Sequence, residues 1–482
     1  MAFARNLKRI LIALLVIAAT AVLVYFGDGL NPVWPLMWFA PLPVLWFAAH
    51  SSWWEAAIAA YVAWLLGFLN MYHYFHLLDS LWFRVYPFVA LLVTIGVLLF
   101  RLMVRRRAAW NALVAFPAVW VSFEYLLNRT TSGGTAGSLA YTQLHFLPFL
   151  QLASITGPWG MSFLMLLFPS AIAIWIHLRK SDPGPARRVL VLTIALLSAV
   201  LGFGAARLSE PPPDHEANVG LIASDQSDNV DTASAGPDAE RLLRAYAEVA
   251  QNLAAEGAQI LVLPEKIAVA ADPGTASVDA IFQSLAEKTG ATIVVGLLHV
   301  VPPDKYNEAR VYTSGAAPLS YDKEHMLPPF ESNLKPGVTR TLLRKPSGTW
   351  GVAICKDMDF TQLSRSYGQA DTGLMLVPAW DFNLDRSWHG HIAVMRGVEN
   401  GFSIVRVAKN GYLTVSDDRG RIVAETRSDA APFATLIAAV PTVHDETLYL
   451  KWGDWFAWLT VGILAVSLLR ALFTRPEASA GS

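Results

Sequence analysis

The sequence predicts a helical membrane domain with many spans, followed by an α/β layered domain and one last span. Two observations predict this organisation. Hydrophobic residues make up 54% of the 482-residue chain and charged residues only 16%, whereas an ordinary soluble domain carries about 25% charged residues. The charge deficit is concentrated in long apolar runs, and alternating strand-like and helix-like segments fill the polar interval between them.

Eight apolar runs have about the length that a bilayer requires, since a spanning helix needs roughly 20 apolar residues. Seven of them lie within the first 207 residues, and one follows the polar interval. They cover residues 10–26, 34–49, 55–77, 86–103, 110–127, 161–178, 189–207 and 455–473. Runs without a polar face argue against the buried core helices of a soluble protein.

The distribution of basic residues predicts the orientation of these spans, because Lys and Arg accumulate in cytoplasmic loops. If the spans alternate, one side receives clusters made up of Arg5, Lys8, Arg9, Arg101, Arg105, Arg106, Arg107, Arg179, Lys180, Arg187, Arg188, Arg470 and Arg475. The other side receives few, among them Arg84 and Arg129. We therefore expect both termini in the cytoplasm and residues 208–450 on the opposite side. We expect the first span to be retained, since no convincing small-x-small cleavage site precedes Asp28.

A Pro-rich linker at 209–216 separates the membrane part from a segment of different texture. Alternating apolar runs and amphipathic patterns predict strands and helices there. The strands fall at 219–224, 259–266, 292–300 and 372–380, the helices at 239–257, 278–290 and 387–401, and further strands joined by Asn-Gly and Arg-Gly turns at 402–425. The predicted domains are 1–207 with about seven membrane helices, 208–450 as the α/β domain, and 451–482 as an eighth helix with a cytoplasmic tail.

Composition excludes several classes of partner and cofactor. A net charge of −1 argues against nucleic acid, because phosphate binding needs a basic surface. A single cysteine excludes an intrachain disulfide and a cysteine-rich metal site. The His389-Gly390-His391 motif has no third ligand near it in the sequence, so we interpret it as structural, and we expect no metal.

The one cysteine, Cys355, follows the apolar run GVAI. It could be a small buried hydrophobic residue. A free thiol outside the cytoplasm, however, is prone to oxidation, so a free cysteine there is a liability unless the protein needs it. A nucleophilic thiol requires a base and a nearby cation. Glu265 follows the apolar run ILVLP, and Lys323 and Glu331 flank a Pro-rich loop. Each could alone be a solvated surface residue; together they predict a base, a cation and a nucleophile at strand ends.

These segments carry a resemblance to a known family. LPE, YDKEHMLPPFE and GVAIC resemble the carbon–nitrogen hydrolase (nitrilase) superfamily and its Glu–Lys–Cys triad. With seven spans before this domain and one after it, nearly the whole chain resembles the apolipoprotein N-acyltransferase family. Further similar segments are QLASITGPWGMSFL (151–164), RGVENGFSIVRVAKNGYLTVSDDRG (396–420) and ETLYLKWGDWFAWL (446–459).

The resemblance implies an αββα sandwich for the α/β domain and a mechanism for the site. Glu265 would be the general base, Cys355 the nucleophile that takes an acyl chain from the sn-1 ester of a phospholipid, and Lys323 the oxyanion stabiliser, with Glu331 supporting them. The acyl chain would pass to the α-amine of a diacylglyceryl-cysteine lipoprotein. The resemblance further implies a bacterial inner membrane protein with a periplasmic catalytic domain and no cofactor.

The chain departs from the family pattern beside the nucleophile. Lys356 and Asp357 follow Cys355 where the family usually has an aromatic residue and a Glu, and Trp380 and Asp381 match a possible substrate-binding stretch only loosely. Three alternatives therefore remain open: a membrane-anchored amidase-type hydrolase, a paralogous acyltransferase that uses another amine, and a non-enzymatic assembly factor. Donor and acceptor specificity and the oligomeric state also stay open at this stage.

Overall fold

The computed structural model describes residues 2–78, 81–211, 215–226 and 235–473, and these form two compact units. The first unit comprises Met1–Thr130, Gly137–Arg207 and Asp454–Ser482, and the second comprises Thr131–Ala136 and Leu208–Gly453. Arg475, the side chain of Arg5, residues 212–214 of the predicted linker and the predicted tail from 474 onward lie outside the described residues.

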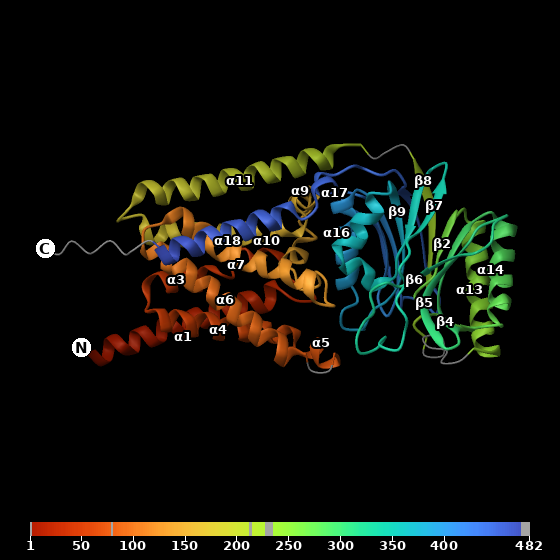
Figure 1. Ribbon diagram of the computed structural model, residues 1–482, viewed down its shortest axis with the longest axis horizontal. Coiled ribbons are helices and arrows are strands. Elements are labelled where there is room, and N and C mark those ends of the chain that lie inside the picture. Colours follow the sequence, from red (N-terminus) through yellow and green to blue (C-terminus); the bar gives the residue numbers. More distant parts are fainter. Residues whose placement is uncertain (1, 79–80, 212–214, 227–234, 474–482) are drawn as a thin grey trace. The chain divides into compact units, whose positions relative to one another are not determined.

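The first unit is all-helical (Figure 1). Among its described residues, seven helical segments are long and apolar enough to cross a membrane: Asn6–Gly27, Trp53–Leu77, Trp82–Arg105, Ala109–Thr130, Pro158–Leu178, Pro183–Ser209 and Trp455–Phe473. They fall in α1 (Ala2–Gly27), α4 (Trp53–Gly67) with η1 (Phe68–Met71) and α5 (Tyr72–Leu77), α6 (Trp82–Arg105), α7 (Ala109–Thr130), α10 (Pro158–Leu178), α11 (Pro183–Ser209) and α18 (Trp455–Phe473). Short helices η2 (Leu139–Gln143), α8 (Leu147–Leu150) and α9 (Ala153–Thr156) connect α7 to α10.

The run predicted to span at 34–49 is broken into α2 (Trp34–Met37) and α3 (Leu42–His50), so it is not among these seven segments. Proline accounts for the break, because it removes a backbone donor and clashes with the preceding turn. Trp38 and Pro41 nevertheless keep right-handed helical dihedral angles, and the backbone N–H of Leu45 still donates to the carbonyl of Pro41. The run is therefore a kinked helical segment rather than a loop.

The second unit is a four-layer α–β–β–α sandwich (Figure 1), which confirms the predicted fold class. One sheet has the order β13–β1–β2–β4–β5–β6, with β3 also paired to β4, and the other has the order β12–β11–β10–β9–β8–β7. The strands of the first sheet are β1 (Glu216–Ala223), β2 (Ile260–Val262), β3 (Ala268–Ala271), β4 (Thr292–Val301), β5 (Asp304–Tyr312), β6 (Leu319–Asp322) and β13 (Ala434–Pro441). Those of the second are β7 (Thr341–Lys345), β8 (Gly348–Val352), β9 (Thr372–Trp380), β10 (Ser403–Lys409), β11 (Tyr412–Ser416) and β12 (Ile422–Arg427).

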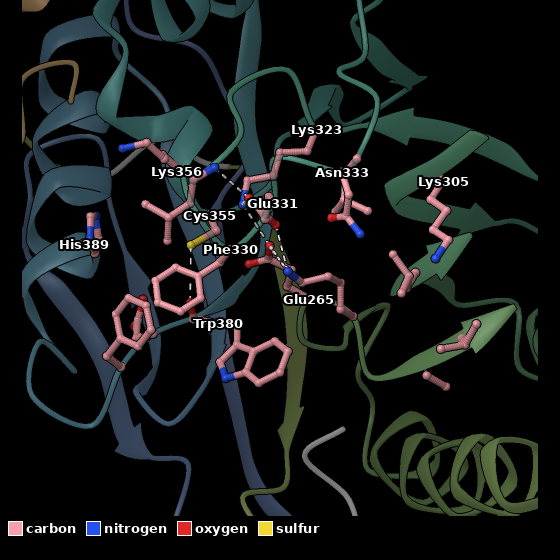
Figure 2. Close-up of a pocket in the computed structure, with 18 of the residues that line it drawn as sticks. Glu265, Lys305, Lys323, Phe330, Glu331, Asn333, Cys355, Lys356, Trp380 and His389 are labelled. Atoms are coloured by element: carbon pink, nitrogen blue, oxygen red, sulfur yellow. Dashed lines mark hydrogen bonds and ion pairs between the residues drawn. The ribbon is translucent and has the colours of Figure 1, made fainter. Parts of the chain in front are cut away.

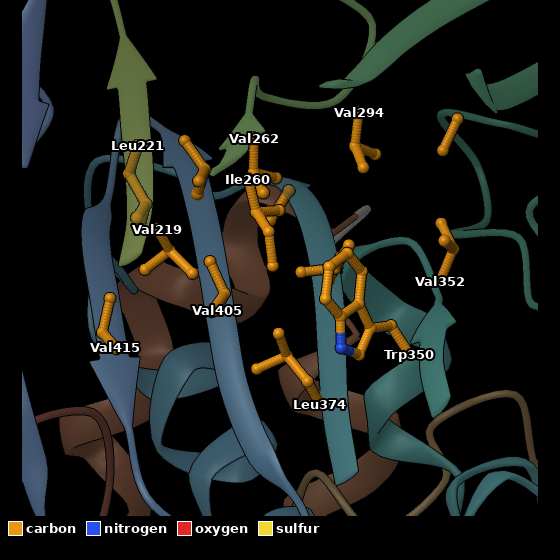
Figure 3. Packing of buried hydrophobic residues seen from close by; sticks show 14 of the residues in the cluster. Val219, Leu221, Ile260, Val262, Val294, Trp350, Val352, Leu374, Val405 and Val415 are labelled. Atoms are coloured by element: carbon orange, nitrogen blue, oxygen red, sulfur yellow. The ribbon is translucent and has the colours of Figure 1, made fainter. Parts of the chain in front are cut away.

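Apolar side chains on the facing sides of the two sheets form the central core (Figure 3). Val219, Val262 and Val294 of the first sheet and Trp350 and Val405 of the second are all buried in it. Helices cover the outer faces: α13 (Pro237–Ala255) and α14 (Thr275–Thr289) on the first sheet, and α15 (Thr361–Gly368) and α16 (Trp388–Asn400) on the second. A final short helix, α17 (Leu448–Trp452), precedes the last span.

Parallel strand pairs place several chain turns at one edge of this sandwich. Strand β2 is parallel to β1 and β4, and β9 is parallel to β8 and β10. Strand β8 ends at Val352, three residues before Cys355, and a 3₁₀ turn η3 (Cys355–Asp359) follows. Since the carboxyl ends of parallel strands open a crevice for ligands, we expect a ligand site among the residues that follow β2, β8 and β9.

A short segment of the second unit comes from far earlier in the chain. Residues 131–136 follow α7 in sequence, but they belong to the α/β unit. The backbone N–H and the hydroxyl of Thr135 both donate to the carbonyl of Asp359, at 3.0 and 2.8 Å. A Cβ on Gly134 would lie 2.6 Å from that same carbonyl oxygen, so only glycine permits this approach to η3.

Candidate active site

Cys355 occupies the sharp turn between β8 and η3. Its φ angle is +44°, in the left-handed region, which costs an L-residue roughly 1–2 kcal/mol. The side chain is 8% exposed and lines a cavity of about 370 Å³ (Figure 2). The turn therefore presents the only thiol of the chain to a cavity wall, which the interpretation as a core filler does not require.

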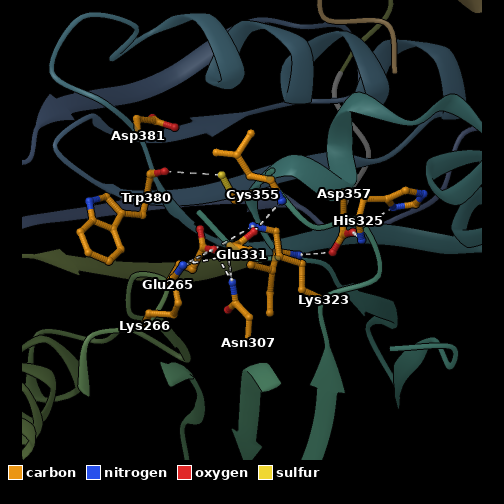
Figure 4. Close-up of polar contacts among 12 residues, drawn as sticks. Glu265, Lys266, Asn307, Lys323, His325, Glu331, Cys355, Asp357, Trp380 and Asp381 are labelled. Atoms are coloured by element: carbon orange, nitrogen blue, oxygen red, sulfur yellow. Dashed lines mark hydrogen bonds and ion pairs between the residues drawn. The ribbon is translucent and has the colours of Figure 1, made fainter. Parts of the chain in front are cut away.

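Glu265, Lys323 and Glu331 form a buried ion cluster beside this turn (Figure 4). The ammonium of Lys323 lies 2.9 Å from Oε1 of Glu265 and 2.8 Å from Oε2 of Glu331, and all three side chains are 2% exposed. The three residues leave different elements: Glu265 follows β2, Lys323 follows β6, and Glu331 lies in the loop before β7. The structure thus brings together the base, cation and supporting residue that the sequence predicted.

Charge pairing outweighs burial in this cluster. Burial disfavours the ammonium of Lys323, but the carboxylates of Glu265 and Glu331 together raise its pKa above the ordinary value. Burial likewise opposes ionisation of Glu331, but Lys323 and Lys266 hold the pKa of that carboxyl at about 2. Lys323 is therefore a permanent cation and Glu331 a permanent anion at neutral pH.

The sequence did not indicate Asn307, which lies in β5. Its amide Nδ2 donates to Oε1 of Glu265 at 2.5 Å and to Oε1 of Glu331 at 2.7 Å. The amide thus holds two carboxylates that would otherwise repel each other. Buried and exposed positions do not alternate along the strand of Asn307, DKYNEARVY, and four of the nine residues are charged, so the local sequence gives no strand signal that could have indicated it.

One carboxylate oxygen of the cluster, Oε2 of Glu265, is buried and has no hydrogen-bond partner among the described residues. Oε1 of the same carboxylate accepts from both Lys323 and Asn307. A buried unpaired acceptor costs about 1–3 kcal/mol. An oxygen of this kind, in the cavity wall that Cys355 also lines, is suited to accept a proton.

Asp357, one of the departures from the family pattern, ties the lysine loop to the cysteine turn (Figure 4). Its Oδ1 accepts from the backbone N–H groups of Glu324 and His325 at 3.2 and 2.8 Å, and its Oδ2 accepts from Ile354 N–H at 3.1 Å and from the Tyr321 hydroxyl at 2.8 Å. The carboxylate is fully buried. It therefore fixes the positions of the residues next to Lys323 relative to those next to Cys355.

Trp380 and Asp381, predicted as possible substrate-binding residues, both line the cavity. The ring of Trp380 has the ammonium of Lys409 above it at 3.5 Å and that of Lys266 at 5.4 Å. The carboxylate of Asp381 is 2% exposed and faces a guanidinium, that of Arg406, with which it forms two hydrogen bonds. Substrate binding by either residue stays a prediction.

Lys356, the other departure, is buried in a network of charges rather than exposed. Its ammonium lies 3.4 Å from Oδ2 of Asp359, whose Oδ1 lies 3.1 Å from Nδ1 of His389. Nε2 of His389 lies 3.5 Å from Asp385. Burial disfavours the charge on Asp359, but His389 and Lys356 lower the pKa of that carboxyl to about 2. His389 is thus an ion-pair partner, and no group of three or more potential metal ligands occurs among the described residues.

The cavity combines this polar wall with apolar side chains. Leu327, Phe330 and Leu334 from the loop before β7 and Phe382 after β9 line it together with Cys355 and Glu265. Phe330 is 51% exposed, and its ring lies 5.3 Å from that of Phe382. The site can therefore accept a substrate that carries an apolar chain next to a reactive carbonyl group.

Comparisons with known proteins match both units. Residues 10–171 match the family model described as apolipoprotein N-acyltransferase N-terminal domain, and residues 221–445 match the model described as carbon–nitrogen hydrolase. A curated apolipoprotein N-acyltransferase from Geobacter metallireducens is 29% identical over 74% of this chain and 73% of its own length. One from Gloeobacter violaceus is 25% identical over 90% of this chain and 89% of its own length.

Solved structures similar to this chain include an amidase from a Nesterenkonia species. It is 19% identical, and the match covers 51% of this chain and 96% of the amidase chain with a TM-score of 0.42.

Proposed function

The chain belongs to the apolipoprotein N-acyltransferase family, and on that premise we propose that it moves an acyl chain from a phospholipid to the N-terminal amine of a diacylglyceryl-cysteine lipoprotein. The observation that carries this proposal is the strained turn at Cys355, which places the only thiol in the same cavity as the ion cluster of Glu265, Lys323 and Glu331. The protein is an acyltransferase with a carbon–nitrogen hydrolase domain and membrane helices.

In the first half-reaction, Oε2 of Glu265 accepts the proton of the Cys355 thiol. The sulfur attacks the carbonyl carbon of the phospholipid sn-1 ester, and a tetrahedral oxyanion forms. When the C–O bond breaks, the departing lysophospholipid oxygen takes the proton back from Glu265, and the acyl chain stays on sulfur as a thioester. The unpartnered Oε2 atom supports this role for Glu265.

In the second half-reaction, the free amine of the lipoprotein attacks the thioester carbon. Glu265 takes a proton from the attacking nitrogen, and the C–S bond breaks. An amide forms, and the sulfur leaves as a thiolate that is reprotonated from Glu265. Because the donor product leaves before the acceptor reacts, this is ping-pong transfer.

Lys323 stabilises the oxyanion in both halves, together with the backbone N–H of Lys356. The support for this role is electrostatic: the ammonium is buried and charged, and it pairs with Glu265 and Glu331, which Asn307 holds in place. A preorganised cation of this kind stabilises a developing negative charge more strongly in a site of low dielectric constant than in water.

The membrane setting follows from the helices of the first unit, and we propose the orientation from the basic loops. Of the seven candidate spans among the described residues, six precede the catalytic domain and one follows it. An even number of crossings would place residues 208–450 on the same side as the N-terminus. We therefore propose that the kinked 34–50 segment is a seventh crossing, which places the domain in the periplasm. Membrane domain 1–207, catalytic domain 208–450 and last span with tail 451–482 remain the proposed functional division.

The test uses the purified protein in liposomes of phosphatidylethanolamine labelled in its sn-1 acyl chain. A thioester on the Cys355 peptide, seen by mass spectrometry and discharged onto a diacylglyceryl lipopeptide, would support the proposal. Label transfer that survives in Cys355→Ser would overturn it. Release of free fatty acid at the same rate with and without lipopeptide would identify a hydrolase instead.

A further inference from the structure

A second cation, separate from Lys323, lies next to the sulfur of Cys355. Nη2 of Arg406 is 4.0 Å from Sγ of Cys355, within hydrogen-bonding distance of a sulfur acceptor. The side chain of Arg406 is 1% exposed. Arg406 lies in the segment 396–420 that resembles the family, but no role is predicted for it from the sequence, because its contact with Cys355 depends on how β10 pairs with β9.

Asp381 fixes the guanidinium in place. Nη1 of Arg406 donates to Oδ2 of Asp381 at 2.8 Å, and Nη2 donates to Oδ1 at 2.5 Å. The backbone N–H of Asp381 donates to the carbonyl of Lys409 at 2.9 Å. This bond continues the parallel pairing of β9 and β10, whose last register pair is Trp380 with Lys409. Nη2 carries two hydrogens in a planar fork, so one can serve Asp381 while the other is directed to Sγ.

We propose that Arg406 is a catalytic residue that binds the Cys355 sulfur whenever it is a thiolate, and that Asp381 is its positioning residue. The proposal deepens the acyl-transfer function and rests on it. Lys323 is the cation for the carbonyl oxygen and Arg406 the cation for sulfur. The reaction thus has a separate positive group for each of its two developing negative charges.

The hydrogen bonds of the sulfur explain why a second cation is needed. As a thiol, Cys355 donates to the carbonyl of Trp380 at 3.7 Å. A thiolate has no proton to donate, and it then faces that carbonyl oxygen with like polarity. The guanidinium of Arg406 is the group in contact that can donate to the anion, and such charge-assisted bonds are about twice as strong as neutral ones.

The charges around the sulfur act in opposite directions. Burial raises the pKa of the thiol most, and the carboxylate of Glu265 raises it further, whereas Lys323 and Arg406 lower it and Asp381 raises it again. Lys323 is shared between two carboxylates. The hydrogen bond to the sulfur from a cation comes from Arg406.

Arg406 acts at two points of the reaction. Before acylation, the S–H bond breaks, the proton goes to Glu265 and the sulfur's negative charge is met by Arg406. In the second half-reaction the C–S bond breaks and its electron pair returns to sulfur, so the leaving group is again a thiolate beside Arg406. The proton balance is that of the proposed mechanism, and no other reactant is required.

The test measures the ionisation of the only thiol directly. Iodoacetamide alkylates a thiolate with loss of iodide, so its rate against pH gives the thiol pKa of Cys355 in the full-length protein without any substrate. A single cysteine makes the labelled site unambiguous. We expect Arg406→Met to raise the midpoint by roughly one to three pH units, the usual effect of an opposite charge within 4–6 Å, and Arg406→Lys to restore part of this shift.

Two further variants keep the result interpretable. The double variant Arg406→Met/Asp381→Leu removes the whole buried pair, which proteins often tolerate better than loss of one partner; its midpoint should also rise, by less. Arg396→Met is the matched control: Arg396 pairs with Glu399 at 2.9 Å, both fully buried, and does not line the cavity. It should lower thermal stability and leave the midpoint unchanged.

The outcomes separate this inference from the proposed function. Folded Arg406→Met with the wild-type alkylation midpoint would overturn the role of Arg406, even if acyl transfer to the lipopeptide occurs. A raised midpoint in a protein that forms no acyl-enzyme from phosphatidylethanolamine would support the thiolate contact and refute the acyl-transfer function. A midpoint that moves equally in Arg396→Met would overturn the inference, since the shift would then report general destabilisation.

Discussion

The carboxylate of Asp357 accepts hydrogen bonds from both the backbone N–H and Nδ1 of His325, at 2.8 and 3.0 Å. His325 lies two residues after Lys323, and Asp357 lies two residues after Cys355. The imidazole of His325 stacks on Phe360 with ring centroids 3.6 Å apart. The contact therefore couples the segment of Lys323, the proposed oxyanion cation, to that of Cys355, the proposed nucleophile, through two residues that do not line the cavity.

Asp357→Asn should reduce kcat/KM of acyl transfer by about 10²-fold, the usual effect of displacing a catalytic group by about 1 Å. The amide replaces one acceptor oxygen by a donor, which then opposes the surrounding N–H groups. Asp417→Asn is the matched control, because Asp417 accepts from two backbone N–H groups in the β11–β12 turn and does not line the cavity. Equal activity of both variants would contradict the positioning role.

Asn307→Asp should move the acid limb of the kcat/KM profile to higher pH by about one unit or more. Glu331 has a pKa of about 2 because Lys323 and Lys266 oppose its burial. A third carboxylate in the cluster favours protonation of Glu331, which weakens its hold on Lys323. The profile is measured with the labelled lipid across the acid and neutral range. An unchanged acid limb would show that Asn307 contributes no electrostatic effect.

Cys355→Gly should be more stable than Cys355→Ala, although both are inactive. The φ angle of +44° suits glycine and strains alanine. Relief of roughly 1–2 kcal/mol of left-handed strain exceeds the roughly 0.5–1 kcal/mol by which glycine's greater unfolded freedom opposes folding. Thermal unfolding of the two variants in the same detergent measures the difference. A higher Tm for the alanine variant would show that the turn is not strained.

His389→Gln should lower stability most at low pH. Burial disfavours the imidazolium, but Asp359 outweighs it and raises the pKa of His389. A raised folded pKa gives stability that is fully present below the unfolded value of about 6.5 and is lost as pH rises through the folded value. The gap in Tm between the wild type and this variant should therefore narrow as the pH is raised from well below that unfolded value to well above the folded one. A gap that widens over that range would contradict the ion pair.

Glu265 and Cys355 were predicted as site residues because each follows an apolar run, and Lys323 because it flanks a Pro-rich loop. The structure places all three around one cavity. Asn307 was missed because β5 carries a charged residue at several positions and therefore does not resemble a strand. The partners of Asp357 and Arg406 depend on sheet pairing between segments far apart in the chain, which local patterns do not encode. The kink at 34–50 was missed because hydropathy does not register the backbone effect of Pro41.

The hydrogen bonds from Thr135 to Asp359 impose an order on folding. These two residues are 224 positions apart, and the segment that carries Thr135 leaves the ribosome long before the cysteine turn exists. Until then this segment has no η3 to bind. Closure of η3 against it is therefore a contact of long sequence separation, and the turn at Cys355 is completed only after synthesis has passed it. A chain interrupted between these points would carry membrane helices but no finished turn at Cys355.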